Sequence, residues 1–185
     1  MTQRTRRRPV LIGISGPIAS GKSAIAGAVG NELRRGGKRT AVIDLDLLYD
    51  MLDDRVGVGK RDETAWQVVR SAAGALSDSL FAAGIEVVVV EGDLFREERT
   101  EFLAALTSRV EGQFVTLRVS YAEALRRAAT DPSRGLSRDA AFLHGHFTAV
   151  ERRLVEIPAS DLVIDTEQDS VEEAASRIIA FAGLA

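Results

Sequence analysis

The chain has 185 residues, which is enough for one α/β domain with a buried core and too few for two ordinary domains. Its apolar fraction of 45 % and charged fraction of 28 % are typical of a globular protein and exclude the disordered and fibrous classes. A net charge of −3 gives no general attraction to nucleic acid, and no apolar stretch reaches the roughly 18 residues of a membrane span, so we expect neither kind of partner.

Short apolar runs alternate along the chain with segments of helical periodicity. After a basic, disordered tail at 1–9, the pattern predicts one domain over 10–185. Its elements in chain order are strand 10–15, helix 23–35, strand 39–43, short helix 47–52, loop 53–62, helix 63–83, strand 85–90, helix 96–108, strand 114–119, helices 122–130 and 137–155, strand 162–164 and helix 171–182. This alternation indicates a parallel sheet with right-handed crossovers.

A phosphate-binding motif lies between the first strand and the first helix. It reads Gly16-Pro17-Ile18-Ala19-Ser20-Gly21-Lys22-Ser23 and has glycine, lysine and serine where the Walker A pattern needs them. The backbone N–H groups of such a turn, continuing through Ala24 at the helix start, surround an anion. We therefore expect ATP to bind here, with Lys22 reaching the β- and γ-phosphates and the Ser23 hydroxyl binding Mg²⁺.

Acidic residues follow the second and third predicted strands. Asp44 and Asp46 follow the second, and Glu91 and Asp93 follow the third. Ligands of open parallel sheets bind beyond the carboxyl ends of the strands, so we expect all four acids on the acceptor side of the site. A kinase needs one carboxylate to take the acceptor's proton and another near Mg²⁺, for which we select Glu91 together with Ser23. The alternative role of such acids is to cap the following helices.

The segment Asp46-Leu47-Leu48-Tyr49-Asp50, together with VVVVEG at 87–92, resembles small P-loop kinases. Uridine kinase has a similar Asp-x-Phe-Tyr and a strand ending in Glu-Gly, and chloramphenicol phosphotransferase has a similar Asp-x-Leu-x-Asp. The resemblance runs from about residue 10 to the end of the chain and is strongest to the chloramphenicol phosphotransferase-like branch. It implies the P-loop NTPase fold, with a five-stranded parallel sheet in the order 2-3-1-4-5 and helices on both faces. It also favours Asp46 over Asp44 as the catalytic base.

The same resemblance implies a helical lid around residues 126–145. In small kinases the arginines of such a lid neutralise charge on the transferring phosphoryl group. We assign Arg127 to the nucleotide, Arg134 to catalysis and Arg138 to the acceptor. The other interpretation is an ordinary surface helix-loop-helix without a role in catalysis. Only three of the 24 basic residues are lysines, so arginines are expected on any surface segment of this chain. The last strand and helix resemble those whose connecting loop lies near the adenine.

No motif identifies the acceptor. The leading interpretation is a kinase that transfers the γ-phosphate of ATP to a hydroxyl of a small metabolite or natural product, including antibiotic-type acceptors. The nearest alternative is a nucleoside or nucleotide kinase, in which Trp66 stacks on a base and Arg61 binds a phosphate; a lone Trp is also typical of a core anchor. A nucleotide-dependent switch ATPase is the third possibility, although the chain has no Asn-Lys-x-Asp motif.

The remaining chemically capable residues receive no catalytic assignment. His144 and His146 are two residues apart on a predicted helix, where their side chains diverge, so we do not expect a shared metal. The chain has no cysteine, which excludes disulfides and fits a cytoplasmic protein. Apolar helix faces at a dimer interface resemble those of a core, so both a monomer and a homodimer remain open.

Overall fold

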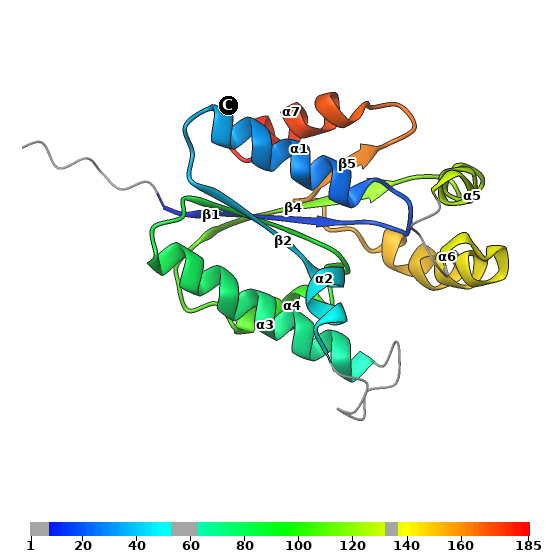
Figure 1. The fold of residues 1–185 in the computed structure, drawn as a ribbon, viewed down its shortest axis with the longest axis horizontal. Helices are drawn as coiled ribbons and strands as arrows, with labels where there is room; N and C mark the ends of the chain where they lie inside the picture. The colour runs from blue at the N-terminus through cyan, green and yellow to red at the C-terminus, as the bar shows by residue number, and fades with distance from the viewer. Residues whose placement is uncertain (1–7, 53–62, 132–136) are drawn as a thin grey trace, which may run out of the picture.

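The computed structural model describes residues 8–52, 63–131 and 137–185, in which a parallel sheet lies between two layers of helices (Figure 1). The sheet has five strands in the order β2-β3-β1-β4-β5, and each neighbouring pair is parallel. The order predicted from the family resemblance is therefore confirmed. The strands are β1 Val10–Ser15, β2 Thr40–Asp44, β3 Val87–Glu91, β4 Glu111–Arg118 and β5 Leu162–Asp165.

The helices cover both faces of the sheet and its carboxyl edge. In Figure 1, α1 (Lys22–Arg35) and α7 (Val171–Phe181) lie above the sheet, and α3 (Glu63–Ala82) and α4 (Arg99–Ala104) lie below it. The short α2 (Leu45–Asp50) follows β2, while α5 (Tyr121–Thr130) and α6 (Ala140–Val155) lie beyond the carboxyl ends of the strands. Among the described residues, no helix is long and apolar enough to cross a membrane.

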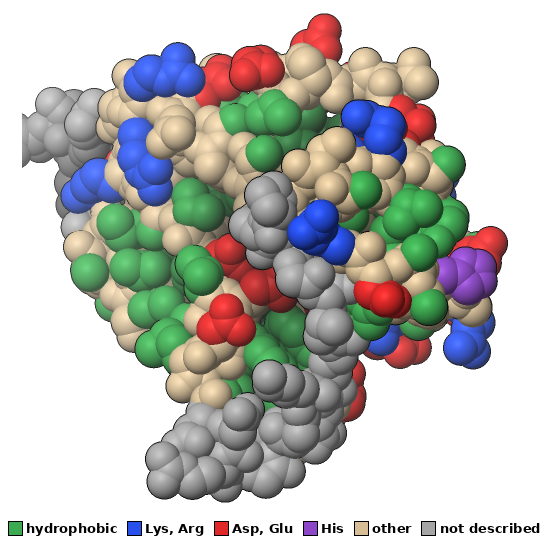
Figure 2. All heavy atoms as spheres, turned by 45° about the vertical axis from the view of Figure 1, so that its right-hand side comes forward, with side chains coloured by type: hydrophobic (Ala, Val, Ile, Leu, Met, Phe, Trp, Pro, Cys, Tyr) green, Lys and Arg blue, Asp and Glu red, His purple; other side chains and the backbone are tan. Residues whose placement is uncertain are grey.

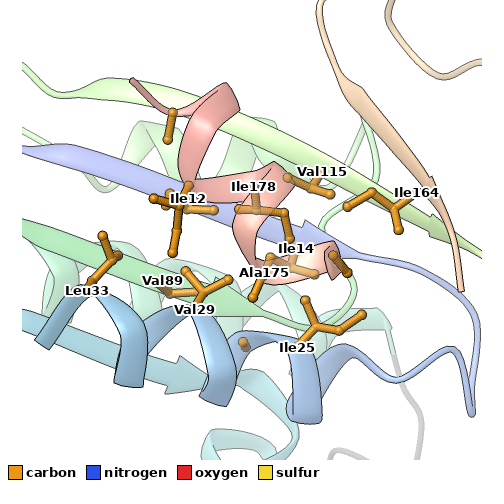
Figure 3. Close-up of a cluster of buried hydrophobic side chains, with 14 of the residues drawn as sticks. Ile12, Ile14, Ile25, Val29, Leu33, Val89, Val115, Ile164, Ala175 and Ile178 are labelled. Atoms are coloured by element: carbon orange, nitrogen blue, oxygen red, sulfur yellow. The ribbon is translucent and has the colours of Figure 1, made fainter. Parts of the chain in front are cut away.

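Two apolar clusters hold the layers together. Every residue of β1 and β3 is buried, because these strands are covered on both faces, and this explains their continuous apolar sequences. Figure 3 shows the cluster between the sheet and α1 and α7, in which Ile12 and Ile14 of β1 meet Ile25, Val29 and Ile178. Alternate residues of the same strands point to the other face, where Leu11, Val88 and Val90 pack with Val69 and Phe102.

Helix α4 is shorter than the predicted helix over 96–108. Asp78 of α3 accepts hydrogen bonds from the Thr107 hydroxyl and from the Ser108 N–H, the latter at 2.8 Å, and holds the segment after α4 as a turn. On the other side, the Arg99 guanidinium donates to the Leu94 carbonyl at 2.9 Å. Helix α6 begins at Ala140, later than predicted, because Asp139 accepts from the Phe142 N–H at 2.7 Å and caps it. Residues 1–7 of the predicted tail over 1–9, and the predicted loop 53–62, lie outside the described residues.

The contact between α3 and α4 depends on a glycine. A Cβ at Gly74 would lie 2.4 Å from the Phe102 carbonyl oxygen and 2.9 Å from the Ala105 Cβ. We predict that Gly74→Ala lowers the free energy of unfolding by about 1–3 kcal/mol, because the two helices must separate. Gly27 of α1 is the matched control, since a Cβ there would meet nothing within 4 Å. Gly27→Ala should be neutral or stabilising by up to about 1 kcal/mol. Urea unfolding of both variants makes the comparison, and equal stabilities would contradict it.

Candidate functional site

The Walker A segment forms a tight loop between β1 and α1. Gly16 lies against β4, where a Cβ would come within 2.9 Å of the Leu117 Cβ and 3.0 Å of its carbonyl oxygen. Gly21 has a φ of 92°, a left-handed value that glycine adopts readily, and it directly precedes α1. Ala19 also has a positive φ, 61°, and is the one non-glycine residue in the described part of the chain that does. Left-handed residues at Ala19 and Gly21 are typical of loops in which backbone N–H groups can face an anion.

Several polar side chains of this loop can bind a charged ligand. The Lys22 ammonium donates to the carbonyls of Gly16 at 3.1 Å and of Pro17 at 3.2 Å, which holds it at the loop. The Ser20 hydroxyl is fully buried and has no hydrogen-bond partner among the described residues. Ser23, in the first turn of α1, lies close enough to Glu91 to lower the pKa of that carboxyl group. A bound triphosphate would supply the charge and acceptors that these groups lack.

Glu91 ends β3 beside the phosphate loop. Parallel pairing aligns it with Ile14 of β1 and with Asp44 of β2, which places the two carboxylates side by side at the edge of the sheet. Glu91 is 1 % exposed, and its Oε2 has no partner among the described residues. Burial raises the pKa of Glu91 to about 7; Ser23 and Lys22 lower it and Asp44 raises it further.

The two aspartates after β2 occupy different environments. The Asp44 carboxylate caps α2, accepting from the Asp46 N–H at 2.8 Å and from the Leu47 N–H at 3.4 Å. Asp46 is accessible to solvent in the first turn of α2. Partial burial of its carboxyl group raises the pKa of Asp46, nearby Lys22 lowers it, and the neighbouring acids Asp44, Asp50 and Asp93 raise it. A carboxylate with a raised pKa is a stronger proton acceptor, as a catalytic base requires.

Asp93 is ion-paired with Arg153 of α6, a residue that the sequence analysis did not select. The Arg153 Nη1 lies 3.1 Å and 3.3 Å from the two Asp93 carboxylate oxygens, and its Nη2 lies 3.1 Å from Glu98. Figure 2 shows acidic side chains gathered near the middle of the face that contains the carboxyl ends of the strands. Arg153 therefore brings a positive charge from α6 to an otherwise acidic region.

The four predicted arginines differ in where the structure places them. Arg127 of α5 donates to Glu123 at 2.7 Å, to the Thr166 carbonyl at 2.7 Å and to the Thr166 hydroxyl at 3.0 Å, and its Nη1 lies 3.5 Å from the Ala19 carbonyl oxygen. It therefore connects the phosphate loop with the segment after β5. Arg138 is exposed in the turn before α6. Arg134 and Arg61 lie outside the described residues.

Trp66 stacks on Tyr49, which was not among the predicted site residues. Their ring centroids are 4.6 Å apart with an interplanar angle of 29°, and both rings are partly exposed. They also pack against the apolar cluster below the sheet, so the core and pocket interpretations of Trp66 are compatible. Tyr49 lies three residues after Asp46, on the same side of α2. Tyr49 of the stacked pair is thus about one helical turn from the candidate base.

One histidine contacts the phosphate loop although neither was given a role. The Ile18 N–H donates to Nε2 of His146 at 3.1 Å, across 128 residues of sequence. His144 instead packs edge-on against Tyr121, with centroids 5.5 Å apart. The two side chains diverge as predicted, and no pattern in the sequence indicates that one of them reaches the loop.

The residues near the loop fit Mg²⁺ held jointly with phosphate. In residues 8–52, 63–131 and 137–185, no group of three or more His, Cys, Asp or Glu side chains could hold a metal by itself. Mg²⁺ is usually bound by one or two protein oxygens together with substrate phosphates and waters. The Ser23 hydroxyl and the unpartnered Oε2 of Glu91 are suitable donors.

Comparison with known proteins now places the chain. A family profile described as adenylylsulphate kinase matches residues 8–136. The chain belongs to the adenylylsulphate kinase family. An adenylyl-sulfate kinase of Staphylococcus carnosus (strain TM300) is 26 % identical over 97 % of this chain and 86 % of its own length.

Solved structures share the fold of this family member. A sugar kinase of Janibacter sp. HTCC2649 superposes with a TM-score of 0.71 at 16 % identity, and the match covers 96 % of both chains. The APS kinase of Mycobacterium tuberculosis in complex with AMPPNP and APS superposes with a TM-score of 0.64 at 18 % identity, covering 94 % of this chain and 97 % of that one. At these identities the likeness concerns the fold alone.

Family membership decides part of what the sequence predicted. The chain is a P-loop kinase, an ATP-dependent phosphotransferase, as the Walker A motif and the strand-end acids indicated. The finer resemblance to the chloramphenicol phosphotransferase-like branch is not confirmed.

The raised pKa of Glu91 predicts how stability depends on pH without ligands. The pKa of Glu91 is about 7 in the folded protein and 4.5 in the ordinary case, so the folded protein binds this proton more tightly than the unfolded chain. The contribution of the bound proton to the free energy of unfolding is complete below pH 4.5 and is lost as the pH rises through 7. The side chain of Gln does not titrate, so Glu91→Gln does not lose stability in this way as the pH rises. We predict that the variant gains on the order of 1–3 kcal/mol over the wild type between about pH 5 and pH 8, measured by urea unfolding.

Glu86 provides a control of opposite sign for this experiment. The Arg39 N–H donates to its carboxylate at 3.1 Å and lowers the pKa of Glu86. Glu86→Gln should therefore lose stability relative to the wild type as the pH rises to about the ordinary value of 4.5, and the difference should stay constant between pH 5 and pH 8. A stability difference between Glu91→Gln and the wild type that stays constant with pH would show that Glu91 titrates normally.

Proposed function

We propose that this protein transfers the γ-phosphate of ATP to a hydroxyl of adenylyl sulfate, with Mg²⁺ as cofactor. The observation that carries the choice of acceptor is the Tyr49–Trp66 stack beside Asp46, in a member of the adenylylsulphate kinase family. An aromatic pair with partly exposed rings is a suitable support for a nucleobase, because every base presents a π-face. Asp46 lies on the same side of α2, where the hydroxyl of a stacked nucleotide can reach it.

The nucleotide side of the reaction uses the phosphate loop. The backbone amides from Gly16 to Ala24 hold the phosphates, apart from those of Ile18 and Ser20, which donate to His146 and to the Pro17 carbonyl. The Lys22 ammonium moves from the loop carbonyls to the β- and γ-phosphate oxygens. Ser23 and Glu91 hold Mg²⁺, which when bound supplies positive charge to the phosphates. Arg127 lies at the nucleotide side through its contacts with Thr166 and with the loop.

The acceptor side uses the carboxylates and cations beyond the strand ends. Asp46 takes the proton of the acceptor hydroxyl; the acceptor oxygen forms a bond to the γ-phosphorus, and the bond from that phosphorus to the oxygen of ADP breaks. Arg153 is placed to meet the acceptor's anionic group. In this proposal Arg134 stabilises the charge on the transferring phosphoryl group, and Arg61 and Arg138 bind the acceptor.

A second candidate acceptor is a neutral polyhydroxylated molecule. The observation in its favour is the excess of carboxylates around the acceptor side, where Asp93 and Glu98 already share the Arg153 guanidinium. Carboxylates are good acceptors for several sugar hydroxyls, whereas an anionic acceptor must approach against them.

An acceptor assay tests the proposal and separates the two candidates. ADP release is followed with adenylyl sulfate, with adenosine nucleotides and with a panel of sugars and polyols, and products are identified by mass spectrometry. We expect acceptor-dependent turnover with adenylyl sulfate and a product heavier by one phosphoryl group. Turnover with a polyol only would establish the second candidate, and ADP release independent of any acceptor would indicate an ATPase. Lys22→Ala, expected to be inactive, is the negative control.

We predict that enzyme kinetics will distinguish the roles of the two aspartates after β2. Asp46→Asn should lower kcat by about 10²–10⁴-fold with little change in ATP affinity, because it removes the base and keeps the shape. Asp44→Asn keeps an oxygen that can cap α2 and should cost less than Asp46→Asn. Steady-state kinetics with ATP and the identified acceptor make the comparison, and a larger loss for Asp44→Asn would transfer the role of base to Asp44.

Trp66 is predicted to affect acceptor binding more than nucleotide binding. Trp66→Ala should raise the KM of a nucleotide acceptor about 10-fold and leave the KM of ATP unchanged, because base stacking is worth roughly 1–3 kcal/mol. Trp66→Phe keeps a stacking ring and should retain most of the affinity. Leu76→Ala, on the same helix and 40 % exposed, is the control for a general effect on α3. Equal changes in the two KM values would contradict the stacking role.

A further inference from the structure

The tip of the phosphate loop is covered by the two helices α5 and α6. Ala19 is buried in a small apolar cluster with Ala124 and Ala128 of α5 and Leu143 of α6, and Ile18 packs against the same cluster. These two loop residues occupy positions of the Walker A pattern that carry no required residue type. Their packing therefore joins the nucleotide loop to the helices of the predicted lid.

Within this contact a side chain of α6 binds the loop backbone. The Ile18 N–H donates to the Nε2 of His146 at 3.1 Å, so this nitrogen is unprotonated and the ring proton is on Nδ1. Ile18 precedes Ala19, whose left-handed φ of 61° is costly for a residue with a Cβ. On the other side of Ala19, the carbonyl oxygen of that residue lies 3.5 Å from the Arg127 Nη1. The strained residue is thus flanked by two contacts from the lid helices.

We propose that His146 is a positioning residue for nucleotide binding. By accepting the Ile18 N–H it keeps the loop in the conformation whose following amides converge on the triphosphate. A loop that spends less time in this conformation binds nucleotide more weakly in proportion to the lost population. Without an acceptor, the Ile18 N–H must find water in a largely apolar contact, and the left-handed Ala19 loses one of its restraints.

The experiment compares three variants of the two histidines. His146→Leu removes the acceptor and keeps an apolar side chain, His146→Gln restores an oxygen acceptor, and His144→Leu is the matched control on the same helix. The dissociation constant of ADP with Mg²⁺ is measured by titration calorimetry, and melting temperatures report on folding. Because the probe is ADP, the result does not depend on which acceptor the kinase uses.

We expect His146→Leu to weaken ADP binding by about 2- to 10-fold, the range for one hydrogen bond, and to leave kcat at saturating ATP within about 2-fold. His146→Gln should recover most of the affinity, and His144→Leu should match the wild type. Wild-type affinity in His146→Leu would overturn the proposal. So would equal losses in His146→Leu and His146→Gln, because the effect would then come from the shape of the ring.

A second measurement applies even if His146→Leu does not fold. Amide hydrogen exchange of the wild-type protein without nucleotide should show the Ile18 N–H protected relative to an unstructured peptide. His146→Gln should retain that protection. An Ile18 amide that exchanges as fast as in an unstructured peptide would show that the hydrogen bond does not persist in solution and would overturn the proposal.

Discussion

The site depends on a carboxylate that is buried beside the phosphate loop. Glu91 ends the fully buried strand β3, and its neighbours are the Ser23 hydroxyl, the Lys22 ammonium and the Asp44 carboxylate. Its Oε2 and the Ser20 hydroxyl have no partners among the described residues. Burying polar groups without partners is unfavourable, and here folding imposes that cost before any ligand arrives. A triphosphate with a divalent cation supplies the missing partners, so the same groups that weaken the ligand-free protein contribute to nucleotide affinity.

The helices beyond the carboxyl edge are attached to this site by a few identifiable contacts. Helix α5 reaches the loop and the segment after β5 through Arg127, and α6 reaches the loop through His146 and the acceptor-side acids through Arg153. His146 and Arg153 are seven residues apart, so they lie on similar sides of α6. One helix therefore contacts both the phosphate loop and the acids beyond β3, so in the proposed reaction a shift of α6 would change the contacts of both substrates.

The sequence predicted those parts of the site that depend on local order or on strand ends. The Walker A segment is continuous, and Asp44 and Glu91 become neighbours because parallel strands end at one edge of the sheet. The contacts it did not predict join distant segments. Arg70 and Arg99 are buried, with partners in Glu101 and Asp161, yet in an arginine-rich sequence they look like any surface arginine. Likewise, nothing near His146 indicates a bond to Ile18, and α4 is shortened by Asp78, which belongs to another helix.

Three arginines lie near the end of β3, and they differ in how easily each could bind an anionic acceptor. Arg70 and Arg99 have side chains 1 % and 9 % exposed, and each is held by carboxylates, so moving either toward a ligand would take a buried guanidinium away from its ion-pair partners. Arg153 differs, because its side chain is 35 % exposed and that of its partner Asp93 is 31 % exposed. Ion pairs of such exposure contribute only about 0–1 kcal/mol, so Arg153 can exchange Asp93 for an acceptor anion at little cost. Asp93 would then face solvent, and Glu98, which is buried, would keep its contact with the same guanidinium. This asymmetry makes Arg153 the most suitable of the three for an anionic acceptor.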